Sequence, residues 1–337
     1  MTTWGTVTTT NAHLPEILDF AAWHLEQGAH RIYVYLDDDM PEAEAALGEH
    51  PALRVFRTDD AWWQERGRRP AKHQVRQTAN ARHANSLPPE VDWLAHIDTD
   101  EFLMPRAPLG DQLAALPQDC LCARVRPVEA LAPLPGTEPG LQRFKAFHLD
   151  QKARQADAEA CFPPWGQHLS GGFLSHVAGK MLFRAGTEGL QIRIHNVELD
   201  GQTNPGQRPL NETELGHFHA ADWERFLLHY RFRMEKGSYR AELKPQGRGN
   251  TPLTLHDFFS VIEEEGGEAA LRVFFEEVCT ATPDLVARLS ARGLLRKCVM
   301  DFPALRARHF PHVTTTGWDE AGPQRIPVSG RSNSRAH

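Results

Sequence analysis

The sequence predicts an α/β fold built on a doubly wound, mostly parallel sheet with helices on both faces. Two observations support this class. Between residues 4 and 97, short apolar runs alternate with segments of helical periodicity, which is the order expected of a parallel sheet. The run at 93–97, WLAHI, has the character of a strand buried on both faces, and it ends abruptly in the carboxylates Asp98, Asp100 and Glu101.

The first half of the chain gives the clearest elements. Residues 4–10 are rich in Thr and Val and predict a strand, and a helix follows with apolar residues at helical spacing from Leu14 to Leu25. Gly28 suits the C-terminal end of that helix. Further strands are expected at 31–36, 53–57 and 93–97, and further helices at 41–49 and 71–86.

The pattern weakens after Pro105. We expect a helix at 109–116 and a strand at 120–128. An irregular insertion rich in Pro, Gly and charge should follow at 129–172. Two short strands at 179–183 and 190–195 are expected to form a hairpin at the sheet edge, followed by a loop at 200–214.

The C-terminal third is predicted to be helical. A helix around residues 223–236 carries a basic stripe of Arg225, His229, Arg233 and Lys236, which is either a solvated face or a surface that faces an anion. Thr254 and Asp257 form a capping-box pattern before three amphipathic helices, and a fourth is expected near 294–302. The predicted division is a main domain at 1–250, a helical C-terminal extension at 251–317 and a disordered tail at 318–337.

Composition excludes several classes of protein. The 337 residues carry a formal net charge of −7, so there is no global basic field for nucleic acid. No apolar run approaches the roughly 20 residues that span a bilayer, and the N-terminus lacks the pattern of a secretory signal. The five cysteines are scattered, as reduced thiols are. We therefore expect a cytoplasmic protein.

The acids after residue 97 are the strongest candidates for chemistry. Ligands bind at the carboxyl ends of strands in such sheets. Asp98 and Asp100 are two residues apart, so they would share one side of an extended backbone and offer hard oxygen ligands to Mg²⁺ or Mn²⁺. The alternative is that Asp98 caps a turn while Asp100 and Glu101 begin a helix.

The residues around these acids resemble those of a known protein family. The segment WLAHIDTDEFL is similar to the WLLxIDxDEFL block of bacterial glycosyltransferases related to family 2, which have the GT-A fold. The resemblance is strong over residues 4–104, patchy to about 250 and absent beyond. The group's usual Asp-x-x-Ser-x-Asp after the second strand is replaced here by residues 37–41, DDDMP. Further landmarks are Asn11, Glu16, Trp23, His24, Gly28, Gln77, Asn80, Gly179, Lys180, His195, His229, Tyr230 and Arg233.

The resemblance implies a metal-dependent transfer of a sugar from a nucleotide-diphospho donor, most of all a UDP-sugar, to the hydroxyl of a glycan or lipid-linked acceptor. It implies an inverting reaction, in surface polysaccharide synthesis and at the periphery of the inner membrane. Asp98 and Asp100 would hold Mn²⁺ or Mg²⁺ on the diphosphate, and the catalytic base, a carboxylate or histidine, is unassigned. His217 and His219 offer a further metal ligand or form a polar turn. The expected donor contacts are Asn11, Asp37, Asp38, Asp39, Gln77, Asp98, Lys180, His229 and Arg233.

Two other functions stay open on the sequence. A nucleotidyltransferase would also combine an α/β sheet, a metal and a nucleotide, although no Gly-rich phosphate loop is present. A non-catalytic sugar-binding protein on the same fold would lack the base.

Overall fold

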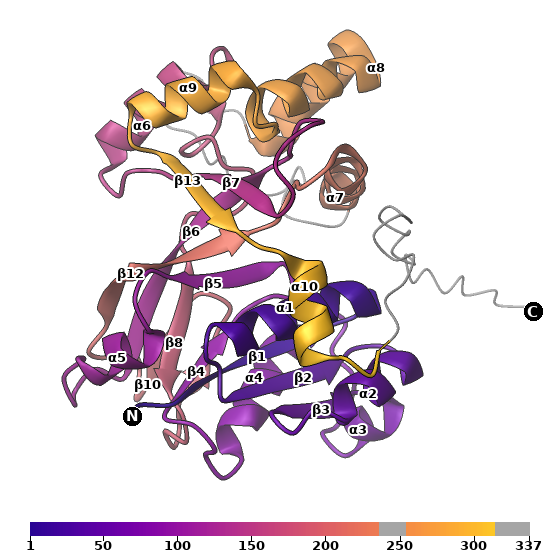
Figure 1. Ribbon diagram of the computed structural model, residues 1–337, viewed down its shortest axis with the longest axis vertical. Coiled ribbons are helices and arrows are strands. Elements are labelled where there is room, and N and C mark those ends of the chain that lie inside the picture. Colours follow the sequence, from indigo (N-terminus) through magenta and orange to yellow (C-terminus); the bar gives the residue numbers. More distant parts are fainter. Residues whose placement is uncertain (236–253, 314–337) are drawn as a thin grey trace, which may run out of the picture.

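The computed structural model describes residues 1–235 and 254–313. The predicted tail at 318–337 and Lys236 of the basic stripe lie outside the described residues. The α/β class is confirmed: the described chain forms ten α-helices, a ten-stranded sheet and a separate three-stranded sheet (Figure 1).

The first half of the molecule forms the parallel part of the sheet, in the order β3-β2-β1-β4. The pattern of the sequence located these elements within a few residues, except for α3, which it did not predict. The strands are β1 (Trp4–Thr10), β2 (Arg31–Leu36), β3 (Leu53–Arg57) and β4 (Trp93–His96). The helices are α1 (Leu14–Glu26), α2 (Pro41–Gly48), the short α3 (Asp60–Gln64) and α4 (His73–Ser86).

Helices cover both faces of this parallel part, as predicted. Side chains alternate across β2, so Ile32 and Val34 join the core under α1, whereas Tyr33 and Tyr35 join the core under α4. The carboxyl ends of the four strands therefore meet at one edge between two helical layers.

Beyond β4 the sheet continues mainly through antiparallel pairs. Next to β4 come β8 (Lys180–Arg184), β6 (Cys122–Leu131), β7 (Leu141–Lys145) and β13 (Leu295–Val299). The long strand β12 (Arg208–His217) pairs in parallel with β6 and antiparallel with β5 (Glu101–Pro105). These strands are far apart in the chain, so their pairing leaves little local signal.

Several predictions for this region are wrong. The insertion at 129–172 is structured, because it contains the end of β6, β7, α6 (Gln151–Cys161) and the 3₁₀ turn η1 (Trp165–His168). No hairpin joins β8 to the next strand: β8 is central, and β9 (Gln191–Ile192) pairs with β10 (Val197–Leu199), which pairs with β11 (Gln202–Thr203). The loop at 200–214 ends in β12, and the fourth C-terminal helix is the strand β13. Strands of mixed composition that are stabilised by distant partners account for these misses.

Helices from the C-terminal part of the described chain build a further apolar core, separate from those on the two faces of the sheet. This core joins α7 (Trp223–Glu235), α8 (Leu255–Cys279), α9 (Pro283–Ala291) and the end of α6. The predicted capping box at Thr254 and Asp257 is present, and α8 is interrupted at Gly267, which has a φ of 57°. The last described helix, α10 (Phe302–His309), packs instead on α1, and α5 (Leu109–Ala114) lies beside β12. Figure 1 shows β13 running from the upper helices toward α10.

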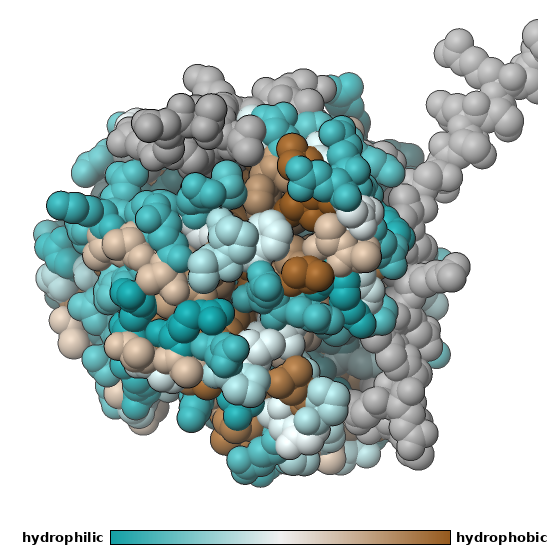
Figure 2. Space-filling model, turned by 90° about the horizontal axis from the view of Figure 1, so that it is seen from above, coloured by the Kyte–Doolittle hydropathy of each residue, from teal (hydrophilic) through white to brown (hydrophobic). Residues whose placement is uncertain are grey.

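The surface seen from above the sheet is mostly polar, with apolar residues in small groups (Figure 2). None of the helices within 1–235 and 254–313 combines the length and apolar character that crossing a bilayer requires.

Candidate functional site

The acidic segment forms a tight turn between β4 and β5 rather than the start of a helix. The backbone N–H of Glu101 donates to the carbonyl of Asp98 (3.0 Å), and the Glu101 carboxylate accepts from the N–H of Asp98 (2.8 Å). Since Glu101 is already the first residue of β5, the alternative in which Asp100 and Glu101 begin a helix is wrong. The turn lies at the carboxyl end of β4, beside β1.

Asp98 is held from two sides and remains partly open. The side-chain amide of Gln77 on α4 donates to Oδ1, and Nζ of Lys180 on β8 donates to Oδ2 at 2.8 Å. The Asp98 side chain keeps 32% of its surface exposed, whereas Lys180 is fully buried. Lys180 also pairs with Glu101 at 3.2 Å. Burial alone would lower the pKa of Lys180, but Asp98 and Glu101 outweigh it and raise the pKa.

Asp100 lies beside histidines. Its Oδ2 lies 3.3 Å from Nε2 of His217, the last residue of β12. Burial would raise the pKa of Asp100, but His217, followed by His229 and Arg225, lowers it overall. For His217, burial would lower the pKa, yet Asp100 and the neighbouring carboxylates raise it to about 9. At neutral pH the pair is therefore a carboxylate and an imidazolium.

His217 belongs to a row of buried charges that crosses four strands. The register places Glu101 on β5 opposite His217 on β12, His217 opposite Glu129 on β6, and Glu129 opposite Lys145 on β7. These four side chains, here called the charge row, are almost fully buried and alternate in sign. Opposite charges on facing strand positions stabilise the pairing. The charge row thus fixes the register of β5, β12, β6 and β7, the strands that position Glu101 and His217.

Lys145 is fully satisfied at the end of the charge row. Its Nζ lies 3.0 Å from Glu129 and donates to the carbonyls of Gly172 (2.7 Å) and Val278 (2.9 Å). Burial would raise the pKa of Glu129, but Lys145 and bonds from Ser175 lower it overall. A buried ion pair with every donor used is costly to break from one side.

A chain of histidines extends from the acidic turn toward α7. The ring centroids of His176 and His195 are 4.0 Å apart, those of His176 and His217 are 5.8 Å apart, and those of His217 and His219 are 5.5 Å apart. Burial, together with His176 and Lys180, lowers the pKa of His195 to about 4. Burial, together with Arg233, also lowers the pKa of His219. His195 and His219 are therefore neutral at physiological pH.

One set of side chains in this region has the spacing of a metal site. One ligand atom from each of Glu101, His176 and His217 lies within 4.8 Å of the other two. This set differs from the predicted pair of Asp98 and Asp100, whose metal role stays a prediction. Sequence reasoning considered His217 as a ligand but missed Glu101 and His176. His176 carries no local signal beyond its place before the Gly179-Lys180 landmark.

The acids that follow β2 lie in different surroundings. Asp37 is buried and paired with Arg76 (2.7 Å), Arg69 (3.2 Å) and His73 (3.2 Å). Burial would raise its pKa, but His73 and Arg76 lower it overall. Asp38 and Asp39 are exposed, as is Asn11 at the end of β1. Their contact with a nucleoside stays a prediction, and Asp37 already has a structural role.

The basic stripe on α7 is half-buried and internally bonded, so its interpretation as a solvated face is wrong for the three described members. Arg225 pairs with Glu16, and Nδ1 of His229 bonds to the carbonyl of His219 at 2.9 Å. Arg233 donates to the carbonyl of Leu174 (3.2 Å) and bonds Nδ1 of His219 (3.1 Å).

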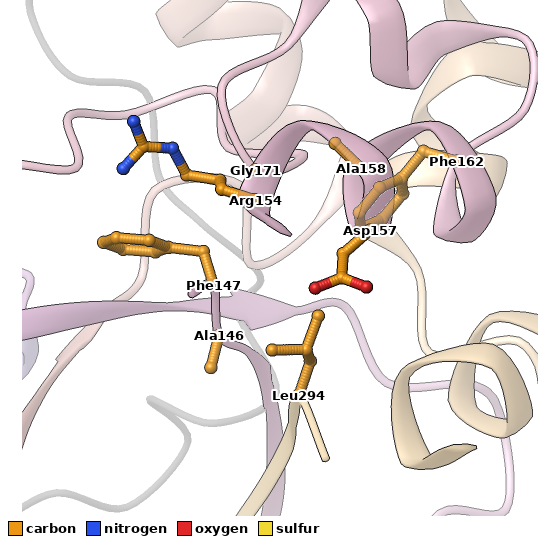
Figure 3. Close-up of a pocket in the computed structure, with 8 residues that line it drawn as sticks. All are labelled: Ala146, Phe147, Arg154, Asp157, Ala158, Phe162, Gly171 and Leu294. Atoms are coloured by element: carbon orange, nitrogen blue, oxygen red, sulfur yellow. The ribbon is translucent and has the colours of Figure 1, made fainter. Parts of the chain in front are cut away.

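Two hollows in the surface lie away from the acidic turn. A hollow of about 540 Å³ lies between Pro88, Pro89 and the turn at 186–191. Since Pro88 and Pro89 precede β4, it is at the amino end of that strand, opposite the acids. A smaller hollow lies between α6 and Leu294 (Figure 3), where Asp157 is already bonded to His148 and Arg292. Neither hollow has the polar convergence found around Asp98.

Comparison with known proteins identifies no family. No protein family matches the chain, and no curated protein is similar enough to count as a relative.

Proposed function

We propose that the chain is a metal-dependent glycosyltransferase with a GT-A-like domain. The observation that carries the proposal is the acidic turn at the carboxyl end of β4, where Asp98 is held by Gln77 and Lys180 and remains partly exposed. Ligands of open α/β sheets bind outside the carboxyl ends of strands. The resemblance of the WLAHIDTDEFL segment to family 2-related glycosyltransferases supplies the reaction.

The residues present fit a divalent ion. The carboxylates of Asp98 and Asp100 lie on one turn. Asp98 has lone pairs beyond those that accept from Gln77 and Lys180. Asp100 has lone pairs beyond the one that faces His217. A bound Mn²⁺ or Mg²⁺ would neutralise the charge that develops on the leaving nucleoside diphosphate. Lys180 holds the carboxylates of Asp98 and Glu101 in place as a buried cation.

The donor would lie along the edge from β2 to β4. Asn11, Asp38 and Asp39 are exposed at this edge and could bind the nucleoside of a UDP-sugar. His229 and Arg233 would neutralise the diphosphate from α7, since arginine suits phosphate. The acceptor hydroxyl, on a glycan or a lipid-linked glycan, would lose its proton to a base among the carboxylates and histidines of the site.

The proposal is tested by nucleotide binding. Calorimetry of the purified chain with UDP and Mn²⁺ should show saturable binding, and Asp100→Asn should weaken it by more than about tenfold, because a charged ligand is lost. The matched control is Asp111→Asn, an exposed acid on α5. Wild-type affinity in Asp100→Asn would refute the metal assignment.

Product analysis separates the alternatives. A glycosyltransferase releases the nucleoside diphosphate from a UDP-sugar in the presence of an acceptor, whereas a nucleotidyltransferase releases pyrophosphate from a nucleoside triphosphate. Binding of UDP-sugars without release of either product would favour the non-catalytic alternative.

A further inference from the structure

Three side chains from separate elements converge beside the acidic turn. Glu101 begins β5, His217 ends β12, and His176 lies in the segment before β8. One ligand atom of each lies within 4.8 Å of the other two. Glu101 and His217 are brought together by the register of β5 and β12, in which they face each other directly.

The three side chains have unused polar atoms. Within the described parts of the chain, Oε1 of Glu101, Nδ1 of His176 and Nδ1 of His217 are buried and lack a hydrogen-bond partner. Glu101 is 0% exposed and His217 is 6% exposed. Buried polar atoms are almost always bonded in folded proteins, so a cluster of orphans needs an explanation. An ion bound among the three side chains would account for unpaired ligand atoms in this place.

The surroundings orient two of the three groups in the way metal ligands are oriented. Lys180 is 3.2 Å from Oε2 of Glu101, and the other oxygen, Oε1, lies 3.5 Å from Nε2 of His176. Asp100 lies 3.3 Å from Nε2 of His217, so Nδ1 of that ring is the atom that would bind an ion, with loss of the imidazolium proton. Metal-binding histidines typically direct their second ring nitrogen to a carboxylate in this way.

The ligand chemistry selects the class of ion. Two imidazoles and one carboxylate suit Zn²⁺ or another first-row transition metal, whereas Mg²⁺ prefers an all-oxygen shell. Three protein ligands leave a coordination position open, and the partial exposure of His176, at 28%, provides access to it.

We infer that Glu101, His176 and His217 bind a first-row transition metal, and that Asp100 orients His217 in this site. The inference concerns the metal alone and is independent of sugar transfer. Its failure would leave the proposed glycosyltransferase to be judged by nucleotide binding and product release.

The test uses the full chain, stripped of metal and without an affinity tag. Zn²⁺ affinity is measured by competition with a chromophoric chelator, and Co²⁺ absorption reports the coordination geometry. The wild type should bind one Zn²⁺ tightly. His176→Gln should weaken binding by more than about 100-fold, beyond the loss typical of an outer-shell change. Asp100→Asn should weaken it by about 10–100-fold and keep the one-to-one stoichiometry.

The control is His195→Gln, a neighbour of His176 whose Nδ1 bonds to the carbonyl of Gly179. It should bind Zn²⁺ as the wild type does. Circular dichroism establishes that each variant is folded, and His176 is the primary target because it is the most exposed of the three. Wild-type affinity in folded His176→Gln, an equal loss in His195→Gln, or displacement of Zn²⁺ by equimolar Mg²⁺ would overturn the inference.

Discussion

The two halves of the central sheet each bury a carboxylate, and they neutralise it differently. In the parallel half, Asp37 at the end of β2 pairs with Arg69, His73 and Arg76, which are close to one another in sequence. In the other half, Glu129 in the middle of the charge row depends on Lys145, which comes from a neighbouring strand and lies entirely inside the protein. The first arrangement is redundant and borders solvent, whereas the second depends on one ion-paired lysine, with His217 facing Glu129 from the other neighbouring strand.

In the parallel half, the partners of the buried carboxylate come from one short stretch of sequence. In the charge row, the partners are brought together by the pairing of neighbouring strands. The parallel half presents charged side chains at its solvent-exposed edge, where a ligand could take the place of a protein partner. The charge row is set by strand register, so its members cannot move independently. We expect substitutions in the charge row to affect folding and those at the open edge to affect binding.

The largest expected effect is the loss of Lys145. Lys145→Met would leave Glu129 without its ion-pair partner and the carbonyls of Gly172 and Val278 without their donor, which should cost roughly 3–5 kcal/mol of unfolding free energy. Urea denaturation measures this. The matched variant Arg76→Met should cost clearly less, because Arg69 and His73 remain on Asp37. Equal losses in the two variants would remove the distinction between the halves.

The next effect is a pH dependence at His24, which links α1 to β5. Its Nδ1 bonds to the carbonyl of Phe20 (2.7 Å), and its Nε2 accepts from the N–H of Leu103 (3.2 Å), so the ring is neutral in the fold. Burial lowers its pKa to about 4. The unfolded chain takes up a proton near pH 6.5 and the folded chain does not, so stability should fall as the pH drops from 6.5 to 4.

The size of this loss is roughly 3 kcal/mol when the shift is converted at 1.36 kcal/mol per pKa unit. His24→Gln should be less stable than the wild type at pH 7, and the gap in unfolding free energy should narrow toward pH 4.5. Urea titrations at a series of pH values measure the gap. A constant gap would mean that His24 does not resist protonation in the fold.

The same contrast explains which parts of the fold and of the candidate site could be predicted from the sequence. Most of the parallel half was placed within a few residues because its strands are short apolar runs, α1 has helical periodicity and Asp98 ends an apolar run, whereas the short helix α3 was not predicted. The meeting of Glu101 with His217 could not be foreseen, since it depends on the pairing of β5 with β12, more than a hundred residues later. His176 lies in a segment without periodic signal. Local patterns therefore singled out Asp98, Asp100 and His217, and missed the cluster that Glu101 and His176 form with His217.

A smaller effect is expected at the open edge after β2. Asp37→Ala should lower the unfolding free energy by roughly 1–3 kcal/mol, because Arg69, His73 and Arg76 lose their shared partner, and should also weaken nucleoside binding. Asp38→Ala, which removes an exposed acid, should weaken nucleoside binding and leave stability unchanged. Denaturation and calorimetry with uridine separate the two quantities. Unchanged uridine binding in both variants would exclude this edge from nucleoside recognition.

The smallest expected effect is at Arg233 on α7, and it tests whether the basic stripe faces a ligand. Arg233 already donates to the carbonyl of Leu174 and bonds His219, so a diphosphate would have to share its guanidinium with these partners. Arg233→Ala should therefore weaken UDP binding by about tenfold, at the low end of a charge-assisted hydrogen bond, and leave uridine binding unchanged. The matched control is Arg231→Ala on the same helix, which removes an exposed arginine paired with Glu268. Surface pairs of this kind contribute little, so Arg231→Ala should bind UDP as the wild type does. Calorimetry with UDP and uridine measures both variants. If Arg233→Ala weakens UDP and uridine equally, its role is to hold His219 in place, and the diphosphate must be neutralised from elsewhere in the site.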